Sequence, residues 1–170
     1  MDSKKNLVLL GMMGVGKTTV GRFLANKLNK KFFDIDKIIE RKKNMSIVDI
    51  FKIKGEFFFR KQEEIETLKH LDMKNSIISL GGGAFLNDKI RNKTLENSHS
   101  FWLTLNKNEL EKRLKNGKKR PLLLNFKTRE LNLLINKRKK FYSLANYKIK
   151  CDKINLKIIC DKIIYLYENA

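Results

Sequence analysis

With 170 residues, 42% of them hydrophobic, the chain has the size and composition of one globular domain. Its formal net charge of +20 comes mainly from lysines scattered over every segment, which is typical of a solvated surface and argues against a dedicated nucleic-acid-binding patch. No stretch approaches the length of a membrane span, the first apolar run is too short for a signal peptide, and Cys151 and Cys160 form no disulfide or zinc pattern. We therefore expect a cytoplasmic, reduced protein that binds neither nucleic acid nor membrane.

Apolar periodicity and turn residues predict strands that alternate with helices along the chain. We expect strands at residues 7–10, 31–33, 76–80, 99–105 and 147–150, and helices at residues 18–29, 37–43, 45–53, 56–71, 88–96, 108–114, 126–145 and 156–167. Gly21 is expected to be a close-packing position, Ser46 to cap its helix and Gly55 to separate two helices. This alternation implies parallel βαβ units, so the predicted fold class is α/β, a three-layer αβα domain with about five strands. Ligands of such sheets bind beyond the carboxyl ends of the strands.

The first predicted strand runs into the segment Gly11-Met12-Met13-Gly14-Val15-Gly16-Lys17-Thr18, which has the spacing G-x-x-x-x-G-K-[ST]. The backbone amides of such a loop and the positive N-terminus of the next helix form a cradle for phosphates. Lys17 is then expected to reach the β- and γ-phosphates, and the Thr18 hydroxyl to bind Mg²⁺. A glycine-rich turn without a ligand is the alternative, but the flanking strand and helix favour a nucleoside triphosphate site.

Two carboxylates, Asp34 and Asp36, follow the second predicted strand. One of them near the phosphates would complete the Mg²⁺ shell, directly or through water. The other could accept a hydrogen bond from a substrate hydroxyl and orient it towards the γ-phosphate, because phosphoryl transfer depends mainly on positioning and charge neutralisation. The alternative is that these residues only cap the following helix.

Arginine is the informative cation here, since the chain has 8 arginines and 30 lysines, and arginine supplies a planar fork that lysine lacks. Arg60 and Glu63 share a helix face at i, i+3 and can pair; a surface ion pair is the alternative, although Arg60 directly follows three phenylalanines. Gly81, Gly82 and Gly83 follow a buried strand and offer backbone amides, or else form only a flexible turn. Together these residues suit a small hydroxy acid as phosphoryl acceptor.

The ordered set of motifs resembles the shikimate kinase family. The motifs are Gly11-x-x-Gly14-x-Gly16-Lys17-Thr18, Asp34-x-Asp36, Asp49-Ile50-Phe51, Gly55-Glu56-x-x-Phe59-Arg60-x-x-Glu63, Leu80-Gly81-Gly82-Gly83, Arg120-Pro121-Leu122-Leu123 and Arg138-x-x-Phe141-Tyr142-x-x-Ala145. The resemblance runs from Leu7 to about Lys150. It implies ATP-dependent phosphorylation of the shikimate 3-hydroxyl, in the chorismate pathway to aromatic amino acids. It also implies the P-loop, nucleoside monophosphate kinase-like fold, with a five-stranded parallel sheet in the order 2-3-1-4-5.

The resemblance also implies roles for residues of the acceptor site. Asp36 would hold the shikimate hydroxyls and serve as the base, within a substrate-binding helical segment at about residues 35–63. Arg60 and Arg138 would clamp the carboxylate beside the amides of Gly81, Gly82 and Gly83, and Phe51 and Phe59 would form an apolar wall around the ring.

On the ATP side, the resemblance places the nucleotide on Gly14, Val15, Gly16, Lys17, Thr18 and Thr19. Asp34 would support Mg²⁺ together with Thr18, directly or through water. Arg120 would contact the γ-phosphate and the substrate from a lid at about residues 115–126. Arg113 would stack on adenine, and an ordinary surface charge is an equal alternative. The strand at 77–80 carries no Walker-B aspartate, and residues 151–156 show no adenine-binding pattern.

Other functions remain open at this point. A kinase for another small hydroxy acid such as gluconate, or for a nucleoside monophosphate, would share the architecture. A non-catalytic, basic, nucleic-acid-binding protein would need an aromatic-interleaved basic surface, which the sequence lacks. The expected partners are therefore ATP and a small acceptor, and the expected state is a monomer.

Overall fold

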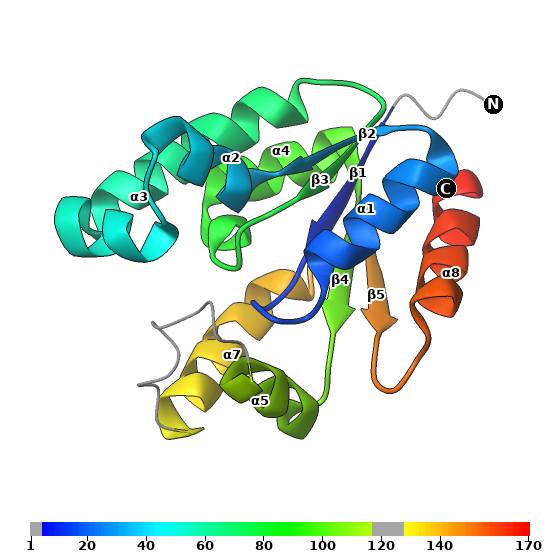
Figure 1. Cartoon of the computed structure of the whole chain (residues 1–170). Helices are drawn as coiled ribbons and strands as arrows, with labels where there is room; N and C mark the ends of the chain where they lie inside the picture. Colours follow the sequence, from blue (N-terminus) through cyan, green and yellow to red (C-terminus); the bar gives the residue numbers. More distant parts are fainter. Residues whose placement is uncertain (1–4, 117–127) are drawn as a thin grey trace.

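The computed structural model in Figure 1 describes residues 5–116 and 128–170. A parallel five-stranded sheet forms its centre, with the strand order β2-β3-β1-β4-β5. This confirms the order implied by the family resemblance. The strands are β1 (Asn6–Leu10), β2 (Lys31–Asp34), β3 (Ser76–Ser79), β4 (Ser98–Thr104) and β5 (Tyr147–Lys150).

Helices cover both faces of this sheet, as Figure 1 shows. They are α1 (Lys17–Leu28), α2 (Ile35–Lys43), α3 (Ile47–Leu71), the short 3₁₀ helix η1 (Ala84–Leu86), α4 (Asp88–Asn97), α5 (Lys107–Asn116), α7 (Thr128–Tyr142) and α8 (Leu156–Glu168).

The alternating side chains of β1 separate two hydrophobic clusters. Leu7 and Leu9 pack with α1 and α8, whereas Val8 and Leu10 pack with α2, α3, α4, α5 and α7. All of these strand residues are buried, as expected for a central strand of a parallel sheet. The three-layer αβα prediction is therefore confirmed.

Glycines fix two features that the sequence predicts. A methyl group at Gly21 would lie 2.2 Å from the ring of Phe32, so this position does bring α1 close to β2. Gly55 has φ 83° and ψ 165°, a conformation that breaks the helix within α3 and favours glycine. The two helices expected at 45–53 and 56–71 therefore meet at this residue, and Ser46 caps the first of them by accepting from the amide of Asp49 at 3.1 Å.

Some predicted boundaries differ from the structure. Helix α2 begins at Ile35, so Asp36 lies in its first turn and not in the preceding loop. Helix α7 ends at Tyr142, three residues before the expected end, and residues 126 and 127 lie outside the described part of the chain.

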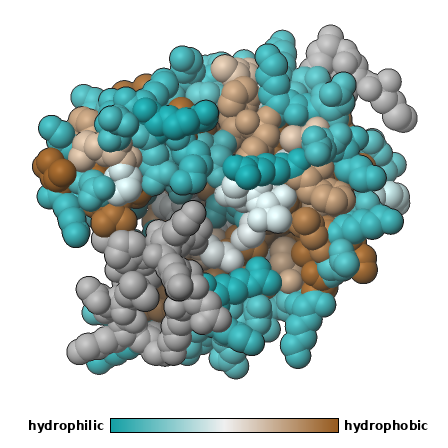
Figure 2. Space-filling model, viewed as in Figure 1, coloured by the Kyte–Doolittle hydropathy of each residue, from teal (hydrophilic) through white to brown (hydrophobic). Residues whose placement is uncertain are grey.

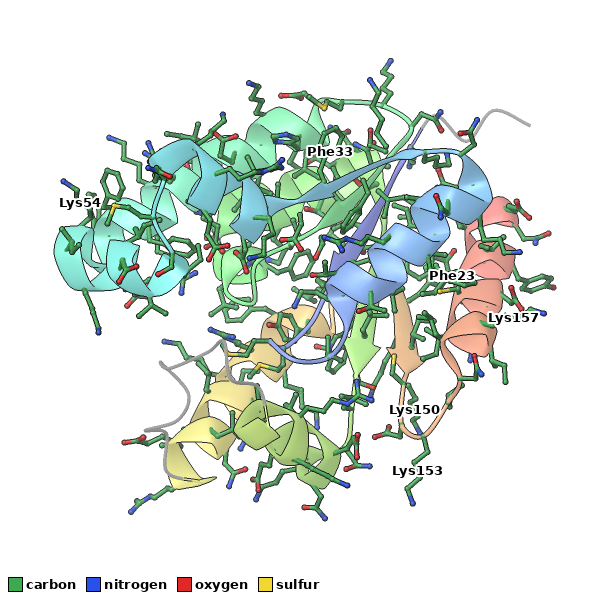
Figure 3. All side chains as sticks on the ribbon, viewed as in Figure 1. Phe23, Phe33, Lys54, Lys150, Lys153 and Lys157 are labelled. Atoms are coloured by element: carbon green, nitrogen blue, oxygen red, sulfur yellow. The ribbon has the colours of Figure 1, made fainter. Side chains whose placement is uncertain are left out.

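Hydrophilic residues spread over the face seen in Figure 2, with separate apolar areas between them. Exposed lysines project from distant places, with Lys54 on α3 and Lys150 and Lys153 around the β5–α8 connection (Figure 3). This spread agrees with the sequence interpretation that the charge is not gathered in one patch. Within residues 5–116 and 128–170, no helix has the length and apolar character needed to cross a membrane.

Candidate active site

The loop between β1 and α1 carries the phosphate-binding motif. Gly14 and Gly16 have φ values of 82° and 105°, which lie in the left-handed region where a side chain would be strained. Gly16 immediately precedes α1, so the loop ends at a helix N-terminus. A loop of this geometry combines backbone amides with the positive end of a helix and suits a bound polyphosphate.

Lys17 and Thr18, the first two residues of α1, point back to this site. The Lys17 ammonium donates hydrogen bonds to the carbonyl oxygens of Gly11 at 2.8 Å and Met12 at 3.1 Å. The Thr18 hydroxyl donates to Oδ2 of Asp34 at 2.6 Å, which links the start of α1 to the end of β2. The structure thus brings together the two residues that the resemblance assigns to Mg²⁺.

Asp34 also caps α2, since its Oδ1 accepts from the amide of Lys37 at 3.3 Å. The capping alternative therefore holds for Asp34, but its second oxygen is engaged by Thr18. Ser79 is the direct neighbour of Asp34 in the sheet register, at the place where β3 lacks an acidic residue.

Asp36 and Glu63 come together at the glycine segment after β3. A methyl group at Gly81 would lie 2.7 Å from Oδ1 of Asp36 and 2.2 Å from Oε1 of Glu63. Two carboxylates from α2 and α3 therefore meet over one glycine, and any side chain there would displace them.

Two guanidinium groups lie close to the next two glycines, one beside each. A methyl group at Gly82 would lie 2.9 Å from Nη1 of Arg138, and one at Gly83 would lie 2.5 Å from Nη1 of Arg60. Arg138 belongs to α7 and Arg60 belongs to α3. Two cations that are far apart in the sequence therefore lie beside adjacent glycines of this turn. The glycine segment is thus a contact surface for charged side chains and not merely a flexible turn.

Arg60 is held by two glutamates of its own helix. Its Nη1 lies 2.7 Å from Oε2 of Glu63, and its Nε and Nη2 lie 3.2 Å and 3.1 Å from Oε1 of Glu56. The guanidinium carbon lies 5.9 Å and 5.3 Å from the ring centres of Phe51 and Phe59, which are 4.8 Å apart. The predicted Arg60–Glu63 pair is therefore confirmed, and Phe51 and Phe59 are brought to the same place.

Glu63 is almost fully buried, with 2% of its surface exposed. Burial raises the pKa of its carboxyl from 4.5 to about 6, Arg60 opposes this rise in the pKa, and the nearby Asp36 adds to it. Among the described residues, its Oε1 has no hydrogen-bond partner. A buried carboxylate with a raised pKa next to arginines makes this place a candidate functional site.

Arg138 is 6% exposed and lies deeper than Arg60. Its Nη1 lies 3.7 Å from the sulfur of Met12, and its Nε has no hydrogen-bond partner in the part of the chain that the structure describes. Tyr142, one turn further along α7, donates a hydrogen bond to the carbonyl of Gly82. Burial raises the pKa of its phenol to about 12, so Tyr142 remains a neutral donor. Arg138 is thus a buried guanidinium with one donor, Nε, that has no partner among the described residues.

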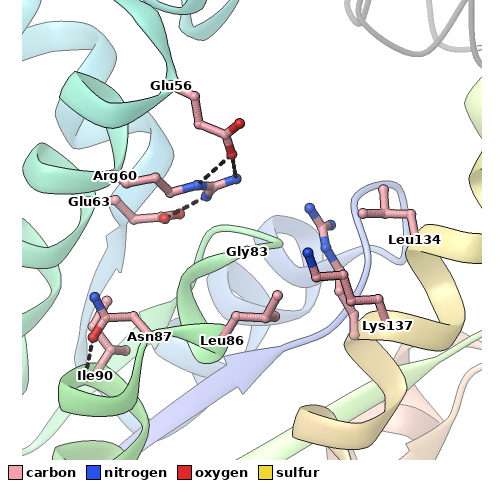
Figure 4. A pocket seen from close by; sticks show the side chains of 10 residues that line it. Glu56, Arg60, Glu63, Gly83, Leu86, Asn87, Ile90, Leu134 and Lys137 are labelled. Atoms are coloured by element: carbon pink, nitrogen blue, oxygen red, sulfur yellow. Dashed lines mark hydrogen bonds and ion pairs between the residues drawn. The ribbon is translucent and has the colours of Figure 1, made fainter.

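A cavity of about 340 Å³ opens beside these arginines, lined by Glu56, Arg60, Glu63, Gly83, Leu86, Asn87, Ile90, Leu134, Lys137 and Arg138. Figure 4 shows Arg60 between Glu56 and Glu63, facing Leu134 and Lys137 of α7 across the cavity. Its size suits a small molecule. Its lining carries three cationic side chains and two carboxylates, both of which pair with Arg60, so the net charge of the lining is positive and favours an anionic ligand.

The remaining predicted ATP residues give a mixed result. Val15 is buried, Thr19 is exposed, and Nη1 of Arg113 would lie 4.0 Å from a methyl group at Gly16. Arg113 is exposed and donates to Glu109 at 3.0 Å, so it is a surface ion pair that faces the phosphate loop. Arg120 and residues 117–126 of the expected lid lie outside the described residues.

Three residues that the sequence analysis quoted only as members of motifs, with no role of their own, contribute to this site. Glu56 stands four residues before Arg60, and Tyr142 four residues after Arg138, so i, i+4 spacing was the available signal for both. No local pattern points to the contact between Met12 and Arg138, which are 126 residues apart.

Comparisons with known proteins agree with this geometry. The family model of shikimate kinase matches residues 13–168. A shikimate kinase from Sulfurihydrogenibium sp. (strain YO3AOP1) is 41% identical over 160 residues, which cover 94% of this chain and 96% of that protein. One from Bacillus subtilis (strain 168) is 41% identical over 165 residues, which cover 95% of this chain and 88% of that protein.

Solved structures lead to the same family. Shikimate kinase from Acinetobacter baumannii in complex with shikimate matches with a TM-score of 0.90 at 32% identity, covering 97% of this chain and 93% of that one. A gluconokinase from Sinorhizobium meliloti 1021 matches with a TM-score of 0.59 at 14% identity, a likeness that concerns the fold alone. The chain belongs to the shikimate kinase family.

Proposed function

We propose that this protein transfers the γ-phosphate of ATP to the 3-hydroxyl of shikimate, giving shikimate 3-phosphate and ADP in the chorismate pathway to aromatic amino acids. One observation carries the proposal: the guanidinium groups of Arg60 and Arg138 lie on adjacent glycines, beside Asp36 and beyond the strand ends that also hold the phosphate loop. Membership of the shikimate kinase family supports it.

In the acceptor site, Arg60 and Arg138 bind the carboxylate of shikimate as planar forks. The hydrogen bonds of Arg60 and the burial of Arg138 already restrict both side chains, so little conformational entropy is lost on binding. Phe51 and Phe59 supply an apolar surface for the carbon ring. Asp36, at the other end of the glycine segment, accepts a hydrogen bond from the reacting hydroxyl and receives its proton as the new O–P bond forms.

In the donor site, Lys17 and the amides of residues 14–19 bind the β- and γ-phosphates, and the lysine moves from its two carbonyl contacts to the transferring phosphoryl group. The Thr18 hydroxyl and Asp34, 2.6 Å apart, fit Mg²⁺ as a shared ligand set that includes water. When bound, Mg²⁺ supplies charge neutralisation at the phosphate oxygens. No cluster of three or more His, Cys, Asp or Glu suited to a metal occurs in residues 5–116 and 128–170, which fits an ion held largely by phosphate and water.

By the same resemblance, Arg113 stacks on adenine and Arg120 contacts the γ-phosphate from the lid. The partners are ATP and shikimate, the active species is a monomer, and the location is the cytoplasm. The two free, buried thiols of Cys151 and Cys160 accord with a reducing compartment.

Measurement of ADP release in a coupled assay tests the proposal. Shikimate, gluconate and nucleoside monophosphates are offered separately with MgATP, and the protein without acceptor gives the background. We expect turnover with shikimate only. Turnover with gluconate or a nucleoside monophosphate, and none with shikimate, would refute the proposal.

A further inference from the structure

Glu56 holds the edge of Arg60 that faces the cavity. We propose that Glu56 is a built-in competitor for the acceptor's carboxylate, and that acceptor binding exchanges the Glu56 carboxylate on Arg60 for the carboxylate of the substrate. This inference rests on the proposed function and names a residue that sets affinity and selectivity at the same site.

The hydrogen bonds of Arg60 divide between two carboxylates. Glu63 accepts a hydrogen bond only from Nη1, with its Oε2 at 2.7 Å. Glu56 takes Nε at 3.2 Å and Nη2 at 3.1 Å, both through the single oxygen Oε1. These two nitrogens form the edge with which a guanidinium binds a carboxylate in a bidentate manner. In this structure Glu56 therefore already occupies this edge, although both of its bonds go to one oxygen atom.

The two glutamates differ sharply in exposure. The side chain of Glu63 is 3% exposed, whereas that of Glu56 is 66% exposed. Displacing Glu63 would leave an unpaired charge in the interior, at a high cost. Displacing Glu56 returns its carboxylate to water, and an exposed ion pair of this kind contributes little. Glu63 is thus the permanent partner of Arg60, and Glu56 the exchangeable one.

The position of Glu56 makes the exchange local. It follows Gly55, where the helix is broken, and it lines the same cavity as Arg60 and Arg138 (Figure 4). A side-chain rotation of Glu56 towards solvent would open the edge of Arg60 without moving the helix. The exchange keeps the number of carboxylates around Arg60 constant, so only an acceptor that brings its own anionic group restores the lost contacts.

Selectivity follows from this requirement. A neutral acceptor of the same shape either leaves Glu56 in place and loses the arginine contact, or displaces it without supplying a replacement charge. Glu56 therefore weakens the binding of the anionic acceptor that must displace it, whereas a neutral acceptor that leaves Glu56 in place bears no such cost; specificity is the difference between these affinities.

The test compares dissociation constants of shikimate and of its neutral methyl ester, measured by ligand titration at low ionic strength. The variants are Glu56→Gln, which keeps the shape, and Glu56→Ala, which removes the competing oxygen. Asp88→Asn is the matched control, because Asp88 is an 80% exposed carboxylate paired with Arg91 on another helix. We expect both Glu56 variants to bind shikimate roughly two- to fivefold more tightly than wild type, the factor carried by one exposed ion pair. The control should change affinity much less. The preference for shikimate over its ester should widen in the Ala variant, because only shikimate has to displace Glu56 in the wild type.

Weaker shikimate binding in both Glu56 variants would overturn the inference, since Glu56 would then hold Arg60 in its binding position. Equal affinity in wild type and both variants would overturn it as well. A crystal structure of the shikimate complex with Glu56 still bonded to Nε and Nη2 of Arg60 would do the same. If wild-type protein fails to bind shikimate at all, the proposed function fails first, so the two failures are distinguishable.

Discussion

The contact between Gly83 and Arg60 gives a sharp test of the acceptor site. In Gly83→Ala, the new methyl group would lie 2.5 Å, 2.8 Å and 2.9 Å from Nη1, Cζ and Nη2 of Arg60, whereas ordinary contacts begin at 3.4 Å. Arg60 must therefore move by about 1 Å while Glu63 and Glu56 restrain it. A misplacement of ~1 Å can cost ~10²-fold in catalysis, so we expect kcat/KM for shikimate to fall by roughly 10- to 100-fold.

Steady-state kinetics with shikimate and with ATP varied in turn measure this effect. The KM for shikimate should rise much more than the KM for ATP, because the displaced group belongs to the acceptor site. Gly21→Ala is the control, since its methyl group would meet Phe32 at 2.2 Å and should lower the melting temperature without a selective rise in the shikimate KM. If Gly83→Ala retained the wild-type shikimate KM, the placement of the acceptor carboxylate at Arg60 would be refuted.

Three further predictions concern charged residues of the site. Asp36→Asn should lower kcat by at least ~10²-fold because a positioned acid–base group is lost, and near-normal turnover would remove Asp36 from the chemistry. Arg138→Lys should raise the shikimate KM far more than the ATP KM, because lysine cannot form a bidentate fork; equal effects on both would argue against this carboxylate contact. Because burial raises the pKa of Glu63 from 4.5 to about 6, the folded protein binds this proton more tightly than the unfolded chain, and its free energy of unfolding falls as pH rises through that window. Urea denaturation at pH 4.5 and pH 7 should therefore show Glu63→Gln gaining about 1.5 kcal/mol relative to wild type, and a constant difference would contradict the burial argument.

Much of the fold was predictable because its determinants are local. The glycines of the phosphate loop, the close-packed Gly21 and the helix break at Gly55 each follow from a backbone requirement that one residue type meets. The order of the strands has no such local code. It followed here from the resemblance of the whole motif set, because strand order depends on which crossovers pack best.

The parts of the candidate site that sequence motifs specify were predictable. Thr18 and Asp34 were expected near the same Mg²⁺, and Arg60 and Glu63 were expected to pair; the structure brings the members of each pair together. The hydrogen bonds of Arg60 with Glu56 were not expected, because i, i+4 spacing of opposite charges is common on solvated helices. Their importance follows from the position of Glu56 in the lining of the cavity. The segment Phe57-Phe58-Phe59 illustrates the same limit, since Phe59 is buried at 3% exposure and Phe57 is 84% exposed.

The central claim is that the phosphoryl group reaches the hydroxyl held at Asp36 while the acceptor's carboxylate lies on Arg60 and Arg138. Phosphorus–proton correlation NMR of the reaction product tests this most directly, because it identifies the phosphorylated carbon. After incubation with MgATP and shikimate, the phosphorus resonance should couple to the proton on carbon 3. Coupling to a proton on another carbon, or the absence of any organic phosphate other than nucleotide, would contradict the account.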